Sequence, residues 1–265
     1  MKFKEIIMKK KLLVFAAVFM LVLSVAGQAM ASFAVGDLIE VVYQTNGLGN
    51  EVATDLGPLT SLTSAASVTD SGNLGNTINF TTLFPGQSVS NLNVAYFMYT
   101  ASGAFWVSGP IPPSDGQTIE ANGHVTAAKS AMNLVQNLYA GNLVSGSTTQ
   151  AQIASSAGNS YWNLLDKNSV AVGSFGTLVN GGTANEANLA NLATTGYVDQ
   201  YLYYYPSSVS GIKNSAGVEI ADIRTFADGS TEIIPLVTTP LPAAFWLLGS
   251  GLVGLVGIRR RKMAV

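Results

Sequence analysis

The chain of 265 residues has no cysteine and one histidine, His124. Without cysteine there are no disulfide bonds, so the fold must rely on its packed core. A zinc site built from histidine and cysteine ligands is excluded, and so is a cysteine nucleophile. A Ser-His-Asp triad would have to use His124, yet the sequence has no Gly-x-Ser-x-Gly motif. These absences remove most of the common routes to catalysis.

Basic residues are also scarce between the two ends of the chain. Residues 32–242 contain fourteen acidic side chains but only four basic ones, which gives this stretch a net charge of −10. A body this acidic is not suited to neutralising phosphates, so nucleic acid is excluded as a partner. The 211 residues are enough to bury a core, and no proline-rich or charged linker divides them. We therefore expect one domain over residues 32–237.

The first 31 residues have the three parts of a secretory signal peptide. Five lysines precede an uncharged apolar run from Leu12 to Ala26, and Ala29 and Ala31 form a small-x-small cleavage site. We therefore expect signal peptidase to cut after Ala31, so that the mature chain begins at Ser32 outside the cytoplasm. The lysines are Lys2, Lys4, Lys9, Lys10 and Lys11.

The last 28 residues, 238–265, contain a second apolar segment. Sixteen uncharged residues, from Ala243 to Ile258, would rise about 24 Å as a helix, close to the thickness of a bilayer core. A basic cluster follows directly, and by the positive-inside rule it belongs in the cytoplasm. The expected topology is a body outside and a short tail inside. The basic residues are Arg259, Arg260, Arg261 and Lys262.

A plain membrane anchor would not need the two prolines that stand before the apolar segment. The order Pro240-Leu241-Pro242, a short glycine-containing helix and an arginine cluster resembles the C-terminus of PEP-CTERM proteins of Gram-negative bacteria, in the subgroup with Val-Pro-Leu-Pro. Two positions depart from the family pattern: Leu241 replaces the commoner Glu, and Thr239 replaces Val. The resemblance covers about a tenth of the chain. It implies processing by a membrane enzyme called exosortase after transient anchoring.

The body predicts a mainly β fold, because short apolar runs alternate with Gly, Ser, Thr and Asn turns. Successive hairpins favour an antiparallel β-sandwich or an open barrel with a few short helices. The clearest helix follows Thr126 and ends at Gly141, and a second, weaker helix is predicted over Gln150 to Ala157. The strands expected most clearly are Asp37 to Tyr43, Val94 to Tyr99, Ala104 to Val107, Tyr161 to Leu165, Tyr197 to Tyr205, Val218 to Phe226 and Thr231 to Ile234.

Two groups of residues in the body are candidates for binding. On a strand, Tyr197, Tyr201, Tyr203 and Tyr205 share one face, where they could stack on sugar rings or form an aromatic ladder inside the protein. Calcium needs oxygen ligands, and no Asp-x-Asp-x-Asp-Gly loop is present. The acids and amides that could still supply them are Asp222, Asp228 and Glu232, or Asp70 with Asn73 and Asn76.

Three hypotheses of function follow. The first, implied by the resemblance, is a non-enzymatic cell-surface or matrix protein that is processed by exosortase and associated with exopolysaccharide in a biofilm. The second is a carbohydrate-binding module that uses the tyrosine face. The third is a secreted hydrolase, which would need two converging carboxylates, although no pair stands out in the sequence.

Overall fold

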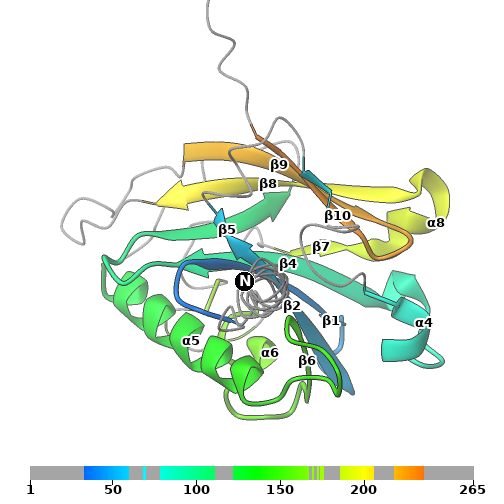
Figure 1. The fold of residues 1–265 in the computed structure, drawn as a ribbon, viewed down its shortest axis with the longest axis horizontal. Helices are drawn as coiled ribbons and strands as arrows, with labels where there is room; N and C mark the ends of the chain where they lie inside the picture. The colour runs from blue at the N-terminus through cyan, green and yellow to red at the C-terminus, as the bar shows by residue number, and fades with distance from the viewer. Residues whose placement is uncertain are drawn as a thin grey trace, which may run out of the picture.

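The structure is a computed structural model that describes residues 33–59, 68–69, 78–110, 122–166, 169, 172, 174–175, 186–205 and 218–235. Ten strands form one antiparallel sheet (Figure 1). The strands are β1 (Asp37–Gln44), β2 (Asn50–Pro58), β3 (Val68–Thr69), β4 (Leu92–Tyr99), β5 (Phe105–Pro110), β6 (Gln150–Ala154), β7 (Glu186–Asn188), β8 (Tyr197–Tyr205), β9 (Val218–Phe226) and β10 (Thr231–Pro235). The helices are α4 (Phe80–Leu83), α5 (Asn122–Ala140), α6 (Tyr161–Leu164) and α8 (Leu192–Thr195), with 3₁₀ turns η1 (Val89–Asn91) and η2 (Leu189–Asn191).

The strand order is β3-β10-β9-β8-β5-β4-β1-β2-β6, and β7 pairs separately with β4. In a flat sheet, five steps of about 4.8 Å would place β10 some 24 Å from β1. In this sheet the Thr231 hydroxyl of β10 donates to Glu40 of β1 at 3.0 Å. The sheet is therefore strongly curled into a half-barrel. The open-barrel form of the sequence prediction describes it better than a sandwich of two separate sheets.

The concave face of the sheet encloses one hydrophobic core. Alternate residues point into it, for example Leu38 and Val42 of β1 and Val94 of β4. At its centre the Tyr96 hydroxyl lies 3.0 Å from Glu40 Oε1 and 2.7 Å from the Thr225 hydroxyl. These contacts join strands from the two halves of the curl. Because the tyrosine is fully buried and close to the charge of Glu40, its pKa is well above the ordinary value.

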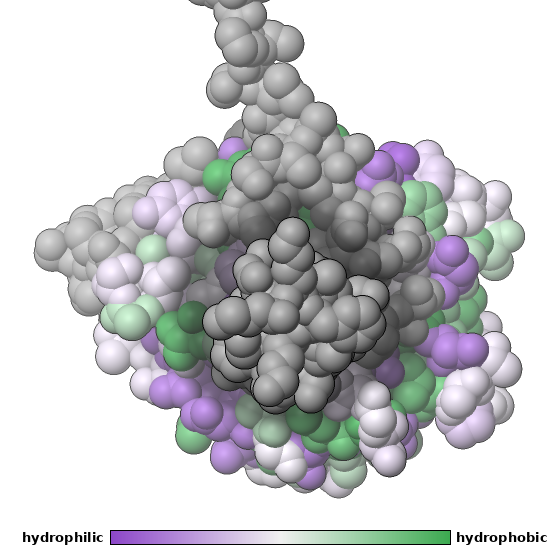
Figure 2. Space-filling model, in the orientation of Figure 1, coloured by the Kyte–Doolittle hydropathy of each residue, from purple (hydrophilic) through white to green (hydrophobic). Residues whose placement is uncertain are grey.

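The convex face carries a second core, which α5 and α6 cover. Val125, Met132 and Val135 of α5 are fully buried there against strand residues such as Val41 and Phe97. Hydrophilic residues line the outer side of α5, interrupted by single hydrophobic residues (Figure 2). This amphipathic pattern is what positions the helix on the sheet. Within the described residues, no helix is both long and apolar enough to cross a membrane.

Most of the expected elements are present, but two were assigned the wrong type. β8 has the predicted bounds, and the predicted long helix is α5, which begins four residues earlier than Thr126. The weak helix predicted from Gln150 is the edge strand β6, which pairs with β2. The strand predicted from Tyr161 to Leu165 is instead the helix α6, whose N-terminus is capped by Ser160. The deciding partner of β6, the strand β2, lies far away in the sequence, whereas the Ser160 cap of α6 is adjacent to the helix.

The tight turn between β9 and β10 provides a test of this packing. Gly229 has a φ of 83°, and a Cβ atom there would lie 1.8 Å from the carbonyl oxygen of Ile78. Gly196 has a similar φ of 80° with nothing within 4 Å, so it is the matched control. We expect Gly196→Ala to lower the free energy of unfolding by about 1 kcal/mol, the cost of the left-handed backbone. Gly229→Ala should cost roughly 1 to 3 kcal/mol more, because the backbone must move.

Urea unfolding of the two variants and the parent chain measures this difference. Equal losses for Gly229→Ala and Gly196→Ala would contradict the close approach of Ile78 to the turn.

Candidate functional site

The tyrosine row of β8 does lie on one face of the strand, but it does not form an exposed platform. Tyr197 is 37% exposed and Tyr201 is half-buried, whereas Tyr203 and Tyr205 are 2% and 0% exposed. Buried rings cannot stack on a sugar, so the four-ring carbohydrate face must be corrected to the two residues Tyr197 and Tyr201. The sequence pattern identified the shared face correctly but did not show that the convex core buries half of it.

The two buried tyrosines form the internal aromatic ladder that was the alternative interpretation. Tyr205 pairs with Phe105 of β5, and their rings stack at 4.8 Å with an interplanar angle of 9°. Tyr203 pairs with Val107 and belongs to the same convex core as α5. Such cross-strand aromatic contacts stabilise a sheet by direct packing. This end of β8 therefore serves the core.

The exposed end of β8 carries an ion pair. Arg224 of β9 lies opposite Asp199 and holds its carboxylate with two hydrogen bonds, at 2.6 Å from Nε and 3.0 Å from an Nη atom. The guanidinium also lies over the Tyr197 ring, 4.0 Å from its centroid. Bidentate pairing and stacking on an aromatic ring both depend on the planar shape of arginine. One side of Tyr197 is therefore already occupied, which further reduces the surface available to a sugar.

Next to this pair lies a small acidic patch, which Asp222 and Glu219 of β9 form beside Asp199. Burial raises the pKa of Asp222, and the neighbouring charge of Asp199 raises it further, against the opposing effect of Arg224. The pKa of Glu219 is raised by burial and then by Asp222. Tyr201 lies among these charges, and its pKa is raised by burial and by Glu219. The patch concentrates negative charge on the convex side of β8 and β9.

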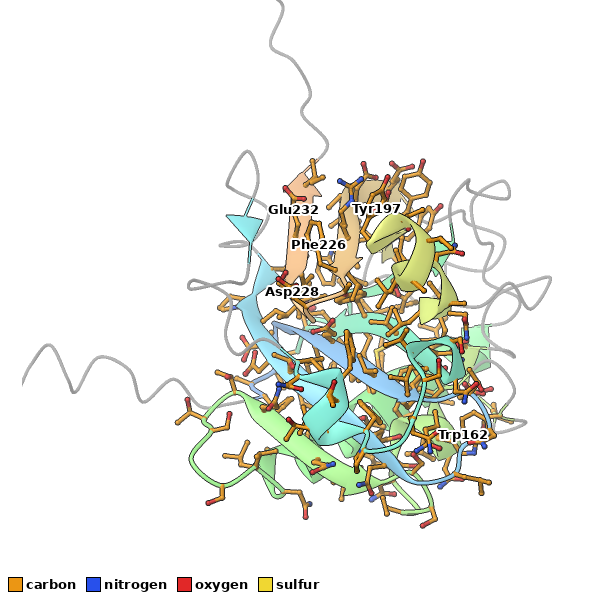
Figure 3. The ribbon with its side chains drawn as sticks, turned by 90° about the vertical axis from the view of Figure 1, so that its right-hand side faces the viewer. Trp162, Tyr197, Phe226, Asp228 and Glu232 are labelled. Carbon is orange, nitrogen blue, oxygen red and sulfur yellow. The ribbon has the colours of Figure 1, made fainter. Side chains whose placement is uncertain are left out.

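The calcium candidates do not converge. Asp228 lies in the β9–β10 turn, where Ser230 donates to it through its backbone and its hydroxyl, while Glu232 lies further along β10 (Figure 3). These hydrogen bonds lower the pKa of Asp228. Asp222 lies towards the other end of the hairpin, opposite Ile234. Among the residues that the structure describes, no three acidic, histidine or cysteine side chains form a metal-holding group. Asp70, Asn73 and Asn76 lie outside the described residues.

A more prominent group of acids lies under the helices on the convex face, and sequence reasoning missed it. Glu51 of β2 is fully buried. Its Oε1 accepts from the Tyr139 hydroxyl of α5 at 2.8 Å and from the backbone N–H of Tyr161 at 2.7 Å, and its Oε2 accepts from the N–H of Trp162 at 3.1 Å. The carboxylate therefore supplies acceptors for the free amides in the first turn of α6. It links β2, α5 and α6.

Two more buried carboxylates flank Glu51. Asp166 accepts from the Tyr43 hydroxyl at 2.7 Å, and Glu186 of β7 accepts from the Tyr161 hydroxyl at 3.1 Å. Burial and the nearby carboxylates raise the pKa values of both tyrosines well above normal, so both remain protonated donors. Charge-assisted hydrogen bonds of this kind are stronger than neutral ones. The arrangement is a buried network of three acids and three tyrosines.

The network has an unusual proton affinity at Glu51. Burial raises its pKa from 4.5 to about 7, against the lowering effect of its hydrogen-bond donors, and Asp166 contributes a further increase. A carboxyl that titrates near neutral pH is a common feature of general acids. Here, however, the donors around Glu51 are two backbone amides and a tyrosine that hold elements of the fold together. The available sequence signal was an acid directly before the apolar pair Val52 and Ala53, in a segment that is buried on both faces of the strand.

The geometry defines a class: a mainly antiparallel β protein with a half-barrel sheet, a helix-covered convex face and a buried acid–tyrosine network. Comparisons with protein-family models, with curated proteins and with solved structures each find no match. The signal segment with Ala29 and Ala31 lies outside the described residues, as do Pro240, Leu241, Pro242, the segment from Ala243 to Ile258 and the cluster from Arg259 to Lys262.

The raised pKa of Glu51 predicts that stability depends on pH. The folded state holds a proton that the unfolded chain has lost, so this contribution is complete below pH 4.5 and is lost as the pH rises to about 7. The loss from this residue is on the order of 3 kcal/mol. Glu51→Gln keeps an acceptor for Tyr139 and Tyr161 but cannot ionise. We therefore expect its free energy of unfolding to fall less steeply over this range.

Denaturant titrations of the parent chain and Glu51→Gln at pH 5, 6, 7 and 8 make this comparison. Asp55 also titrates in part of this range, but it is present in both chains and cancels. The same slope in both chains would contradict the assignment to Glu51.

Proposed function

We propose that this chain is an exported surface or matrix protein of a Gram-negative bacterium. Signal peptidase removes residues 1–31, the segment from Ala243 to Ile258 anchors the chain transiently, and an exosortase-type enzyme processes it near Pro240-Leu241-Pro242. The released body is associated with exopolysaccharide. The observation that carries the proposal is the ordered series of paired prolines, apolar segment and basic cluster at residues 240–262.

The boundaries of the folded body are compatible with this order of events. The first described residue, Phe33, comes two positions after Ala31, and the last strand, β10, ends at Pro235, five positions before Pro240. All the strands of the described sheet lie between the two proposed processing sites. Removal of both ends would therefore take away none of these strands.

The chemistry of the described acids favours a non-enzymatic role. Glu51 caps α6, Asp166 holds Tyr43 and Glu186 holds Tyr161, so each carboxylate of this buried network has a structural function. On the surface, Arg224 and Asp199 are engaged with each other. Within the described residues, we place the weak contact with polysaccharide on Tyr197, Tyr201 and the acidic patch.

The intact mass of the protein recovered from the medium and from the outer surface tests the proposal. The full chain is expressed in a bacterium that carries an exosortase-type enzyme. We expect a mass that begins at Ser32 and ends near Pro240 to Pro242. A mass that retains residues 243–265 would identify a permanent anchor and overturn the processing step.

A variant with Pro240→Ala and Pro242→Ala separates the motif from the helix that follows it. It should still be exported but remain in the membrane fraction with its C-terminus intact. A variant with Pro235→Ala, outside the motif, is the matched control and should be processed normally. Equal processing of all three chains would show that the two prolines are not read.

A further inference from the structure

The first residues that the structure describes, Phe33 and Ala34, are held firmly. Phe33 is 4% exposed and packs against Tyr139 of α5, with their ring centroids 5.6 Å apart. Its φ of 59° lies in the left-handed region, which a bulky residue rarely adopts unless its surroundings impose it. Phe33 is therefore packed into the convex core.

Two acidic side chains bind the backbone of this segment. The Phe33 N–H donates to Asp55 Oδ2, and the Ala34 N–H donates to Asp37 Oδ2 at 2.8 Å. Asp37 and Asp55 are 7% and 6% exposed and hydrogen-bond to each other. Burial raises the pKa of both, that of Asp55 to about 6, and the charge of Asp37 adds to the effect on Asp55. Two nearly buried carboxyls thus share one small site.

A third buried group completes the site. The side-chain amide of Gln136, on α5, donates to the carbonyl oxygens of both Phe33 and Ala34, at 2.6 Å to the first. Gln136 is 3% exposed, and its Oε1 accepts no hydrogen bond within the described residues. Leaving a buried carbonyl without a donor is costly. The site therefore has one acceptor without a donor and two acids without a described cationic partner.

We propose that Asp37, Asp55 and Gln136 form a binding site for a primary ammonium group, the α-amino group of a mature chain that begins at Ser32. The inference rests on the proposed removal of the signal peptide. Cleavage after Ala31 would create a positive charge on the residue directly before Phe33. A precursor has a neutral peptide group at the same position.

Covalent geometry limits where this amine can be. The nitrogens of consecutive residues are within about 4 Å of each other, whatever the backbone angles. The Ser32 amine therefore starts close to the Phe33 N–H that Asp55 already binds. An ammonium group has three donors, and the site has three acceptor groups, namely two carboxylates and the Gln136 carbonyl.

The charge balance also favours this occupant. Two carboxyls this close resist ionising together, whereas a neighbouring cation stabilises both charges. Between Ser32 and Pro242 the chain has only four basic side chains, one of which, Arg224, is paired with Asp199. The amine released by processing supplies the missing positive charge. Signal cleavage would thus complete the fold as well as release the protein.

Two chains with defined N-termini test the proposal, each kept in detergent with its C-terminus intact. One begins at Ser32 and the other at Ala29, and both are released from a cleavable fusion that leaves no extra residue. We expect the Ser32 chain to melt several degrees higher. We also expect the pKa of its α-amine, followed by its rate of acetylation at different pH values, to lie at least one unit above the ordinary 7.7–8.0, a tenfold increase in proton affinity.

Asp55→Asn, which retains an acceptor for Phe33, should remove the difference between the two chains, whereas Glu219→Gln, a surface acid on β9, should leave it unchanged. Equal melting temperatures together with an ordinary amine pKa in the parent chains would overturn the proposal. If Asp55→Asn fails to fold, the amine pKa in the Ser32 chain decides the matter alone. Because both N-termini are set by design, this result is independent of where the exported protein is cleaved.

Discussion

The curl of a single antiparallel sheet is the constraint on which the rest of this structure depends. It brings β1 and β4 against β9 and β10, so that Glu40, Tyr96 and Thr225 meet at the centre of the concave face. A buried polar group is tolerated only with partners, and the curl supplies them from strands far apart in the sheet order. The same curl leaves the convex face to be covered by α5 and α6, which creates the second core.

The convex core shows how a few buried acids can organise a chain that has no disulfide bonds. Glu51 joins β2 to α5 and α6, and Asp55 joins β2 to the first residues of the body. Both lie on the same face of β2, because side chains alternate along a strand and Glu51 and Asp55 are an even number of positions apart. Both have a pKa raised by burial, so the protein carries part of its stability in groups that titrate between acid and neutral pH. The hydrogen bonds of these two buried acids hold separate elements of the fold together.

Prediction from the sequence was most accurate where the pattern is local. The strand patterns of Tyr197 to Tyr205, Val218 to Phe226 and Thr231 to Ile234 were sufficient to place β8 and the β9–β10 hairpin. It was inaccurate where contacts with a segment far away in the sequence determine whether a segment is a helix or a strand. Gln150 to Ala154 has the composition of a helix but pairs with the edge of β2, and the first-turn amides of α6 find their acceptor in Glu51, 110 positions before Tyr161. The acid–tyrosine network was missed for the same reason.

By itself the sequence determined the mainly β class, the faces of the strongest strands and the acidic character of the body, because each depends on composition or on a short repeat. The two proposed processing signals also lie in short stretches of sequence, at residues 1–31 and 238–265. Only the tertiary structure decided which tyrosines of β8 are exposed, which acids are buried and what surrounds Phe33. Those properties arise from contacts between segments distant in the chain, and no local pattern records such contacts.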